Sequence, residues 1–132
     1  MKITVDGMGG DNAPLEIVKG VVEAAALTKH QIIIVGDESQ INSELAKYKY
    51  NKEQISVVHA SEVITNDDAP VKAVRTKQDS SMVKGINMVK NNEAELFVSA
   101  GNTGALMAAG LFILGRIQGI DRPAIASTYP IL

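Results

Sequence analysis

The chain has 132 residues, of which 45% are hydrophobic, and its formal net charge is -2 at pH 7. This is the size of one globular domain, and the apolar content is sufficient for a hydrophobic core. The chain has no cysteine, which excludes disulfides, thiolate metal sites and a cysteine nucleophile. Aromatic residues make up only 4%, so we expect no nucleic acid among the partners, because single strands are bound largely by stacking on aromatic side chains.

No stretch of the sequence predicts export or membrane insertion. The N-terminus enters a strand pattern directly and lacks the apolar region of a signal peptide. The longest apolar stretch without charge, residues 105–115, is about half of the roughly 20 residues that a membrane span needs. We therefore expect a cytoplasmic protein.

Hydrophobic patterns divide the chain into alternating strands and helices. Alternation of polar and apolar residues marks the first strand, and short β-branched runs mark strands that are buried on both faces. Apolar residues at helical spacing mark the helices. The predicted elements are a strand over 2–6, a helix over about 14–28 capped by Asp11 or Asn12, a strand over 31–35, a weaker helix over 41–48, a strand over 55–59, helices over about 70–76 and 80–90, a strand over 96–98, a helix over 104–115 and a fifth strand over 124–128.

This order of elements indicates an α/β fold. Strands that alternate with helices predict three layers, a mostly parallel sheet with helices on both faces and right-handed connections. Repeats, low-complexity tracts and linkers are absent, so residues 1–132 are expected to form a single α/β domain. A fifth strand without a following crossover leaves the sheet without its next covering element, and we expect this domain to be the N-terminal part of a longer enzyme.

Two glycine-rich turns, residues 7–10 and 101–104, each follow a predicted strand. In open α/β sheets, ligands bind outside the carboxyl ends of the strands, so both turns are expected at the same edge. Glycines leave backbone N–H groups accessible at a helix start, which is how anion sites are built. Asp6 is placed to orient the first turn or a ligand. Either turn alone fits tight packing equally well, but the two together favour a ligand site.

Several known motifs are absent. The chain has no phosphate-binding P-loop, and the first turn has Asn12 where a dinucleotide fingerprint needs its third glycine. Asp37 is interpreted as a turn former rather than a ribose ligand. Ser99 lies outside a nucleophile-elbow motif. His30 and His59 lack further ligands at metal-binding spacing, so no metal site is expected.

Residues 70–90 carry five cations and only one acidic residue, Asp79. This segment fits either a face for an acidic partner or a solvated helix surface. Lys72 and Arg75 are three residues apart and share a helix face, so they either neutralise an anion together or form an ordinary surface pair. The pair Ser80 and Ser81 is interpreted as a helix cap.

Three stretches of the sequence form a specific combination: residues 5–11 (VDGMGGD), residues 70–75 (PVKAVR) with 80–82 (SSM), and residues 99–105 (SAGNTGA). Together they resemble the PlsX family of acyl-acyl-carrier-protein:phosphate acyltransferases, which form acyl phosphate for bacterial phospholipid synthesis. One departure is Gly7, where the family often has alanine. Members of the family are considerably longer, so the resemblance covers their N-terminal part.

The resemblance implies a fold akin to phosphate acetyltransferases and isocitrate dehydrogenase-like enzymes, and a homodimer that associates peripherally with the membrane. It implies acyl carrier protein and inorganic phosphate as partners. Phosphate attacks the thioester directly, so no cofactor, metal or covalent serine is required. The expected substrate-binding residues are Asp6, Gly9, Gly10, Lys72, Arg75, Ser99, Gly101, Asn102, Thr103 and Gly104. No residue is assigned as the general base.

Two alternative functions stay open. One is a phosphate acetyl- or butyryltransferase that uses an acyl-coenzyme A thioester. The other is a non-catalytic module that binds phosphate or the carrier protein.

Overall fold

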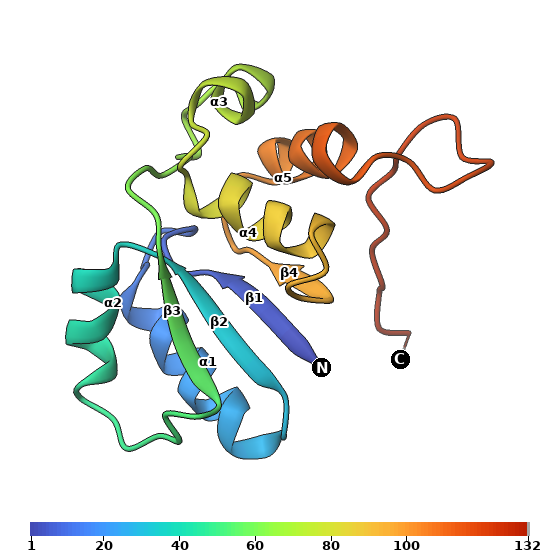
Figure 1. Ribbon diagram of the computed structural model, residues 1–132. Coiled ribbons are helices and arrows are strands. Elements are labelled where there is room, and N and C mark those ends of the chain that lie inside the picture. Colours follow the sequence, from blue (N-terminus) through green and yellow to red (C-terminus); the bar gives the residue numbers. More distant parts are fainter. Residues whose placement is uncertain (132) are drawn as a thin grey trace.

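The computed structural model describes residues 1–131 and shows a four-stranded parallel sheet in the order β3-β2-β1-β4 (Figure 1). The strands are β1 (Lys2–Asp6), β2 (Gln31–Gly36), β3 (Ile55–His59) and β4 (Leu96–Val98). These four strands confirm the prediction. Because all of them are parallel, their carboxyl ends meet at one edge of the sheet.

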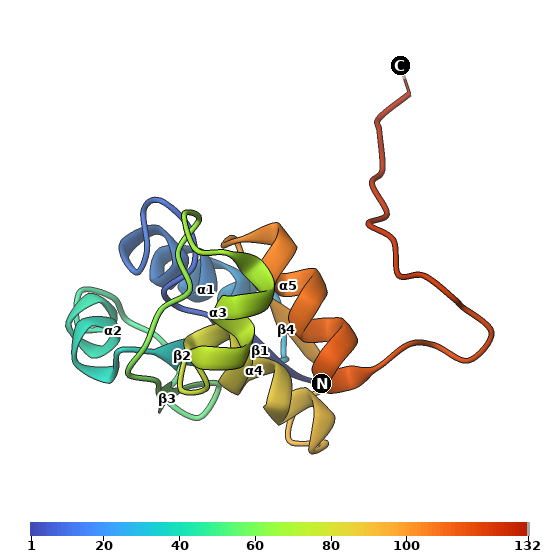
Figure 2. The same cartoon turned by 90° about the horizontal axis from the view of Figure 1, so that it is seen from above.

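Helices lie on both faces of the sheet, which confirms the three-layer α/β architecture. α1 (Leu15–Leu27) and α2 (Glu38–Leu45) pack on one face. α4 (Ser81–Lys90) packs on the other face against β1, β2 and β4. α3 (Pro70–Thr76) and α5 (Thr103–Ala109) contact each other and lie beyond α4 (Figure 1; Figure 2 gives the view from above).

Each face of the sheet has its own hydrophobic core. Under α1 and α2, the fully buried Val18 packs with Ile34 of β2. On the other face, Met82 and Ile86 of α4 form a cluster with small residues of α5. Ile34 and its neighbour Val35 are both completely buried, which confirms β2 as a strand enclosed on both faces.

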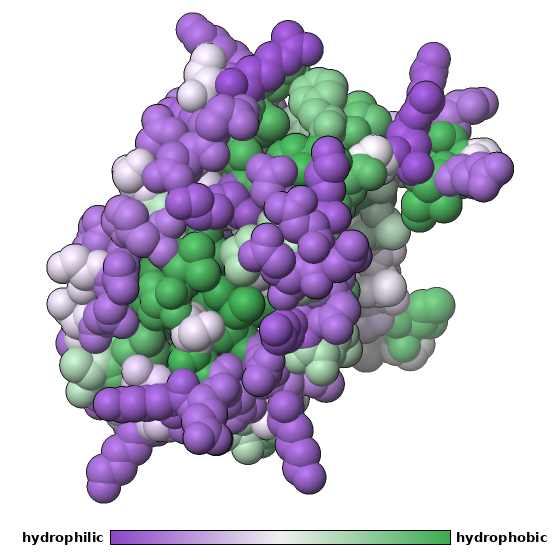
Figure 3. Space-filling view, in the orientation of Figure 1, coloured by the Kyte–Doolittle hydropathy of each residue, from purple (hydrophilic) through white to green (hydrophobic). Residues whose placement is uncertain are grey.

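Helical cover of the α4 face is thin over β2 and β3. Ile33 and Val58 are only partly buried there, and they pack against the small cluster of Val35, Ala60 and Met88. Figure 3 shows apolar side chains at the surface over these two strands.

The starts of the first two helices differ from the prediction. α1 begins at Leu15, and no side chain caps it, so the expected cap by Asp11 or Asn12 is wrong. Asn12 contributes only its backbone carbonyl, which accepts a bond from the N–H of Glu16 at 3.0 Å. α2 begins several residues earlier than predicted because the Asp37 carboxylate accepts the N–H of Gln40 at 2.9 Å.

The long helix predicted over residues 104–115 changes its hydrogen bonding midway. α5 ends at Ala109, and a π-helical turn, η1 (Gly110–Leu114), continues it. The N–H of Gly115 donates to the carbonyl of Gly110 at 3.0 Å, which is the wider i to i−5 pattern. Gly115 then ends the helix with a positive φ of 84°.

The fifth strand predicted over residues 124–128 is wrong. Residues 123–131 have no regular secondary structure, and the whole segment is exposed. It extends away from the sheet (Figure 2). A strand needs a neighbour for its backbone N–H and C=O groups. The β-branched and apolar residues of this segment indicate only a tendency to form a strand, and no described strand pairs with the segment.

Candidate active site

The carboxylate of Asp6 is the centre of a hydrogen-bond network at the carboxyl edge of the sheet. Its Oδ1 accepts the N–H of Met8 at 3.1 Å, the N–H of Gly9 at 2.9 Å and the hydroxyl of Ser81 at 2.6 Å. Its Oδ2 accepts the hydroxyl of Ser99 at 2.8 Å. Asp6 is only 2% exposed, and burial of a charge is tolerated when hydrogen bonds satisfy it. These four bonds join the loops after β1 and β4 to the start of α4.

The two glycine-rich turns touch each other, as the sequence predicted for the common edge. A Cβ on Gly101 would lie 3.2 Å from the Cα of Gly9, and a Cβ on Gly9 would collide with the Asp6 carboxylate. Gly10 has a positive φ of 108°, which favours glycine. The hydroxyl of Ser99 accepts the N–H of Gly101 at 3.0 Å, so the same hydroxyl serves both turns.

Hydrogen bonds of the Asn102 side chain hold the start of α5 in place. Its Oδ1 accepts the N–H of Ala105 at 3.0 Å and caps the helix. Its Nδ2 donates to the carbonyl of Thr65 at 3.0 Å and to that of Asp68 at 3.2 Å. Both polar atoms of this expected ligand residue are therefore used within the protein, where they hold the loop between β3 and α3 against the α5 start.

Thr103 and Gly104 form the first turn of α5. Thr103 is exposed. Gly104 is required for packing, since a Cβ would lie 2.9 Å from Cγ of Pro70 at the start of α3. Among residues 1–131, no acceptor bonds the backbone N–H of Thr103 or Gly104, as is usual for the first helical positions. These two N–H groups therefore have no acceptor within the described residues.

A cavity of about 230 Å³ lies between the first glycine turn and the loop 63–67, and Gly101 forms part of its wall. Asp11 and Asp67 are among the residues that line it. Next to it, Asp68 accepts Nζ of Lys77 at 2.6 Å and the N–H of Thr65 at 2.8 Å. The bond from Lys77, followed by that from Thr65, lowers the pKa of Asp68 below its ordinary value.

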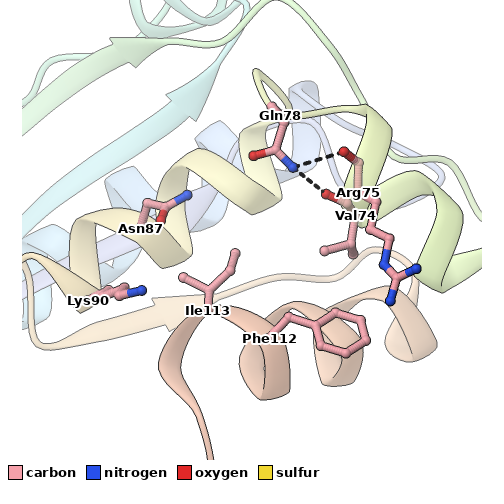
Figure 4. Close-up of a pocket in the computed structure, with 7 residues that line it drawn as sticks. All are labelled: Val74, Arg75, Gln78, Asn87, Lys90, Phe112 and Ile113. Atoms are coloured by element: carbon pink, nitrogen blue, oxygen red, sulfur yellow. Dashed lines mark hydrogen bonds between the residues drawn. The ribbon is translucent and has the colours of Figure 1, made fainter.

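Lys72 and Arg75 are on α3, and neither lines this cavity. The Arg75 guanidinium stacks over the ring of Phe112 at 5.4 Å. It lies in another groove, of about 260 Å³, which Lys90 of α4 also lines (Figure 4). The structure thus brings Asp6, Ser99 and the two turns together, while Arg75 is directed to the groove between α3, α4 and η1.

Ser81 was missed as a site residue. The sequence pattern assigned Ser80 and Ser81 together to a helix cap, but only Ser80 has this role, accepting the N–H of Val83 at 3.3 Å. Ser81 instead binds the carboxylate of Asp6. The sequence held one signal for this role: a single hydroxyl suffices to cap a helix, so the second serine was left without a function there.

The described part of the chain has neither a metal-binding cluster nor a membrane-spanning helix. Residues 1–131 contain no group of three or more His, Cys, Asp or Glu side chains arranged to hold a metal ion. None of the helices described in this range is long and apolar enough to cross a membrane.

One family model and several curated relatives match this chain over nearly its whole length. The sequence model of a family described as "Fatty acid synthesis protein" matches residues 1–132. The chain is 55% identical to the phosphate acyltransferase of Alkaliphilus oremlandii over 98% of this chain and 39% of that protein. It is 50% identical to the enzyme of that name from Clostridioides difficile, over 98% of this chain and 38% of the relative. For the Pediococcus pentosaceus phosphate acyltransferase, identity is 56% over 100% of this chain and 37% of the relative.

The chain therefore spans about two fifths of the length of the curated relatives that it matches. The match over all 132 residues means that this chain belongs to the fatty acid synthesis protein family.

Proposed function

We propose that this chain is the N-terminal part of a phosphate acyltransferase that transfers an acyl group from acyl carrier protein to inorganic phosphate in bacterial phospholipid synthesis. The observation that carries the proposal is the contact between the two glycine turns around Asp6, in a chain whose relatives are named phosphate acyltransferases. The relatives are much longer, so the remaining walls of the site come from sequence beyond this domain.

The proposed reaction needs orientation and charge stabilisation more than covalent chemistry. An oxygen of phosphate attacks the thioester carbon, a C–O bond forms, the C–S bond breaks and the carrier thiol leaves as thiolate, which takes up a proton. Preorganised N–H donors stabilise the developing oxyanion and hold the nucleophile. In our proposal the open N–H groups of Thr103 and Gly104 and the Thr103 hydroxyl bind phosphate, and Gly9 and Gly10 form the opposite wall.

In this proposal α3 brings positive charge near the start of α5, because it packs on α5 through Pro70 and Gly104 and carries Lys72. Arg75 of the same helix stacks over Phe112 in a separate groove, so its charge is assigned to the carrier-protein surface and not to the phosphate site. The variant Arg75→Met tests the role of the arginine separately. It removes the charge while keeping an unbranched apolar side chain against Phe112.

The α3–α4 face is the proposed docking surface for the acidic carrier protein. Of its cations, Lys77 and Lys84 are already paired, with Asp68 and Asp79. Lys72, Arg75 and Lys90 form no ion pair within residues 1–131. Charge complementarity of this kind mainly raises the association rate, so the Michaelis constant for the carrier substrate should rise with ionic strength.

Homodimer formation, peripheral membrane association and a cytoplasmic location are also proposed, on the resemblance to the family alone. Sedimentation of the purified protein tests the first. Flotation with phospholipid vesicles tests the second.

Replacing Thr103 by valine tests whether the turn of residues 101–104, called the phosphate turn below, binds phosphate. In the full-length protein, Thr103→Val should raise the Michaelis constant for phosphate about tenfold, because one hydrogen bond to a charged ligand is lost. Thr28→Val is the matched control, since its hydroxyl bonds only the carbonyl of Ala24 at the end of α1. An unchanged phosphate constant in Thr103→Val would remove that turn from the proposal.

Two further assays separate the alternatives. Turnover with acyl-coenzyme A in preference to acyl carrier protein would identify a phosphate acetyl- or butyryltransferase instead. If residues 1–132 alone turn over acyl carrier protein with phosphate, a second part of the enzyme is not required.

A further inference from the structure

Ser81 lies at the start of α4, in a different layer of the fold from the glycine turns. It is 1% exposed, and its hydroxyl donates to Oδ1 of Asp6 at 2.6 Å. The two residues are 75 positions apart in the chain. This bond joins the sheet edge directly to the helix layer that packs on β1.

The Asp6 carboxylate connects Ser81 to both turns through hydrogen bonds. Oδ1 also accepts the N–H groups of Met8 and Gly9 in the first turn. Oδ2 accepts the hydroxyl of Ser99, which in turn accepts the N–H of Gly101 in the second turn. Rotation of the carboxylate would therefore weaken bonds in both turns at once.

Ser81 is the donor that limits this rotation from outside the two turns. Its side chain is buried between α4 and the sheet, so it has a defined position. Of the other donors, Met8 and Gly9 lie within the first turn, and Ser99 lies two residues before the second. A Cβ on Gly101 would lie 3.2 Å from the Cα of Gly9, so the two turns are close neighbours, and the Asp6 carboxylate is bonded to both sides.

We propose that Ser81 is a positioning residue of the phosphate acyltransferase site: through the Asp6 carboxylate it sets the separation of the two glycine turns, and thereby the geometry of the phosphate site. This inference rests on the proposed function for its kinetic consequence. Its structural consequence is independent of that function.

The experiment compares Ser81→Ala with Ser80→Ala in the full-length protein. Both remove a buried hydroxyl at the start of α4, but Ser80 only caps the helix and does not contact Asp6. Ser81→Ala should raise the Michaelis constant for phosphate about tenfold and leave that for the acyl donor within about twofold, because the turns that bind phosphate lose their set separation. Ser80→Ala should lower the melting temperature and leave both constants within about twofold. Equal kinetic effects of the two variants, or no selective effect of Ser81→Ala, would overturn the inference.

Amide hydrogen exchange supplies a readout that does not depend on turnover. In Ser81→Ala, the N–H groups of Gly9 and Gly101 should exchange about tenfold faster relative to those of β2, which stays packed. Unchanged exchange at both glycines would overturn the inference even if the kinetics changed. If the unmutated protein neither binds nor turns over phosphate, the proposed function fails, while the exchange result still decides the role of Ser81.

If Ser81→Ala does not fold, a second variant at the same position tests the proposal. Ser81→Cys retains nearly the size of the side chain and supplies a weaker S–H donor in place of the hydroxyl. Because this donor should hold the Asp6 carboxylate less firmly, the N–H groups of Gly9 and Gly101 should exchange faster than in the unmutated protein. The same exchange rates in both proteins, together with an unchanged Michaelis constant for phosphate, would refute the proposal.

Discussion

Replacing Asp6 by asparagine is the most direct test of the network that holds the glycine turns. Asparagine has nearly the same shape, so the change alters charge and hydrogen bonding with little change in packing. One of its side-chain atoms can replace Oδ1 as an acceptor for Met8, Gly9 and Ser81. The other becomes an NH₂ group that faces Ser99, whose hydroxyl already accepts the N–H of Gly101.

The expected loss follows from these bonds. Three bonds to a charged acceptor become neutral, which weakens each by about 0.7 kcal/mol, and the hydroxyl of Ser99 loses its acceptor, which costs about 1 kcal/mol. Removal of the buried charge offsets part of this loss, because no ionised carboxylate then has to be held away from water. We therefore expect Asp6→Asn to lower the free energy of unfolding by about 2 kcal/mol.

Urea unfolding followed by circular dichroism measures this change. Asp11→Asn is the control, because this carboxylate in the following loop is exposed and accepts no hydrogen bond within residues 1–131. Such a surface substitution should change the free energy of unfolding by less than about 0.5 kcal/mol. If Asp6→Asn and Asp11→Asn have the same small effect, the Asp6 network does not stabilise the fold, and the reasoning from its four bonds is refuted.

Two further predictions concern stability away from the phosphate turn. Gly85→Ala should lower the free energy of unfolding by about 1–3 kcal/mol, because the new Cβ would lie 2.7 Å from Cδ2 of Phe97. Gly20→Ala has open space around its new Cβ, so it should raise the free energy of unfolding by up to about 1 kcal/mol. Equal thermal shifts of the two variants in calorimetry would contradict the packing argument. Hydrogen bonds from Lys84, and then from Ser61, hold the pKa of Asp79 well below its ordinary value of 3.8, so the stabilisation from this carboxylate is present above that value and is lost as the pH falls through the lowered pKa. Acid titration monitored by circular dichroism should therefore show a shallower loss of stability in Asp79→Asn, and parallel curves for the two proteins would refute the assignment.

Those elements whose signals are local can be predicted from the amino-acid sequence. The β-branched run of β2 requires burial on both faces, and two glycine-rich turns after parallel strands must meet at one edge of the sheet. Asp6 could be placed at that edge for the same reason. Each of these inferences needs only the chain near the residue and the general rules of α/β folds.

Which distant groups meet depends on how the elements pack, and sequence patterns do not reveal it. The bond between Ser81 and Asp6 spans 75 positions, and it depends on how α4 packs on β1. Arg75 turns to Phe112 because η1 brings that ring close to α3, which its spacing from Lys72 does not reveal. The apolar residues 124–128 form no strand, since a strand exists only with a hydrogen-bonding neighbour and sequence pattern alone cannot supply one.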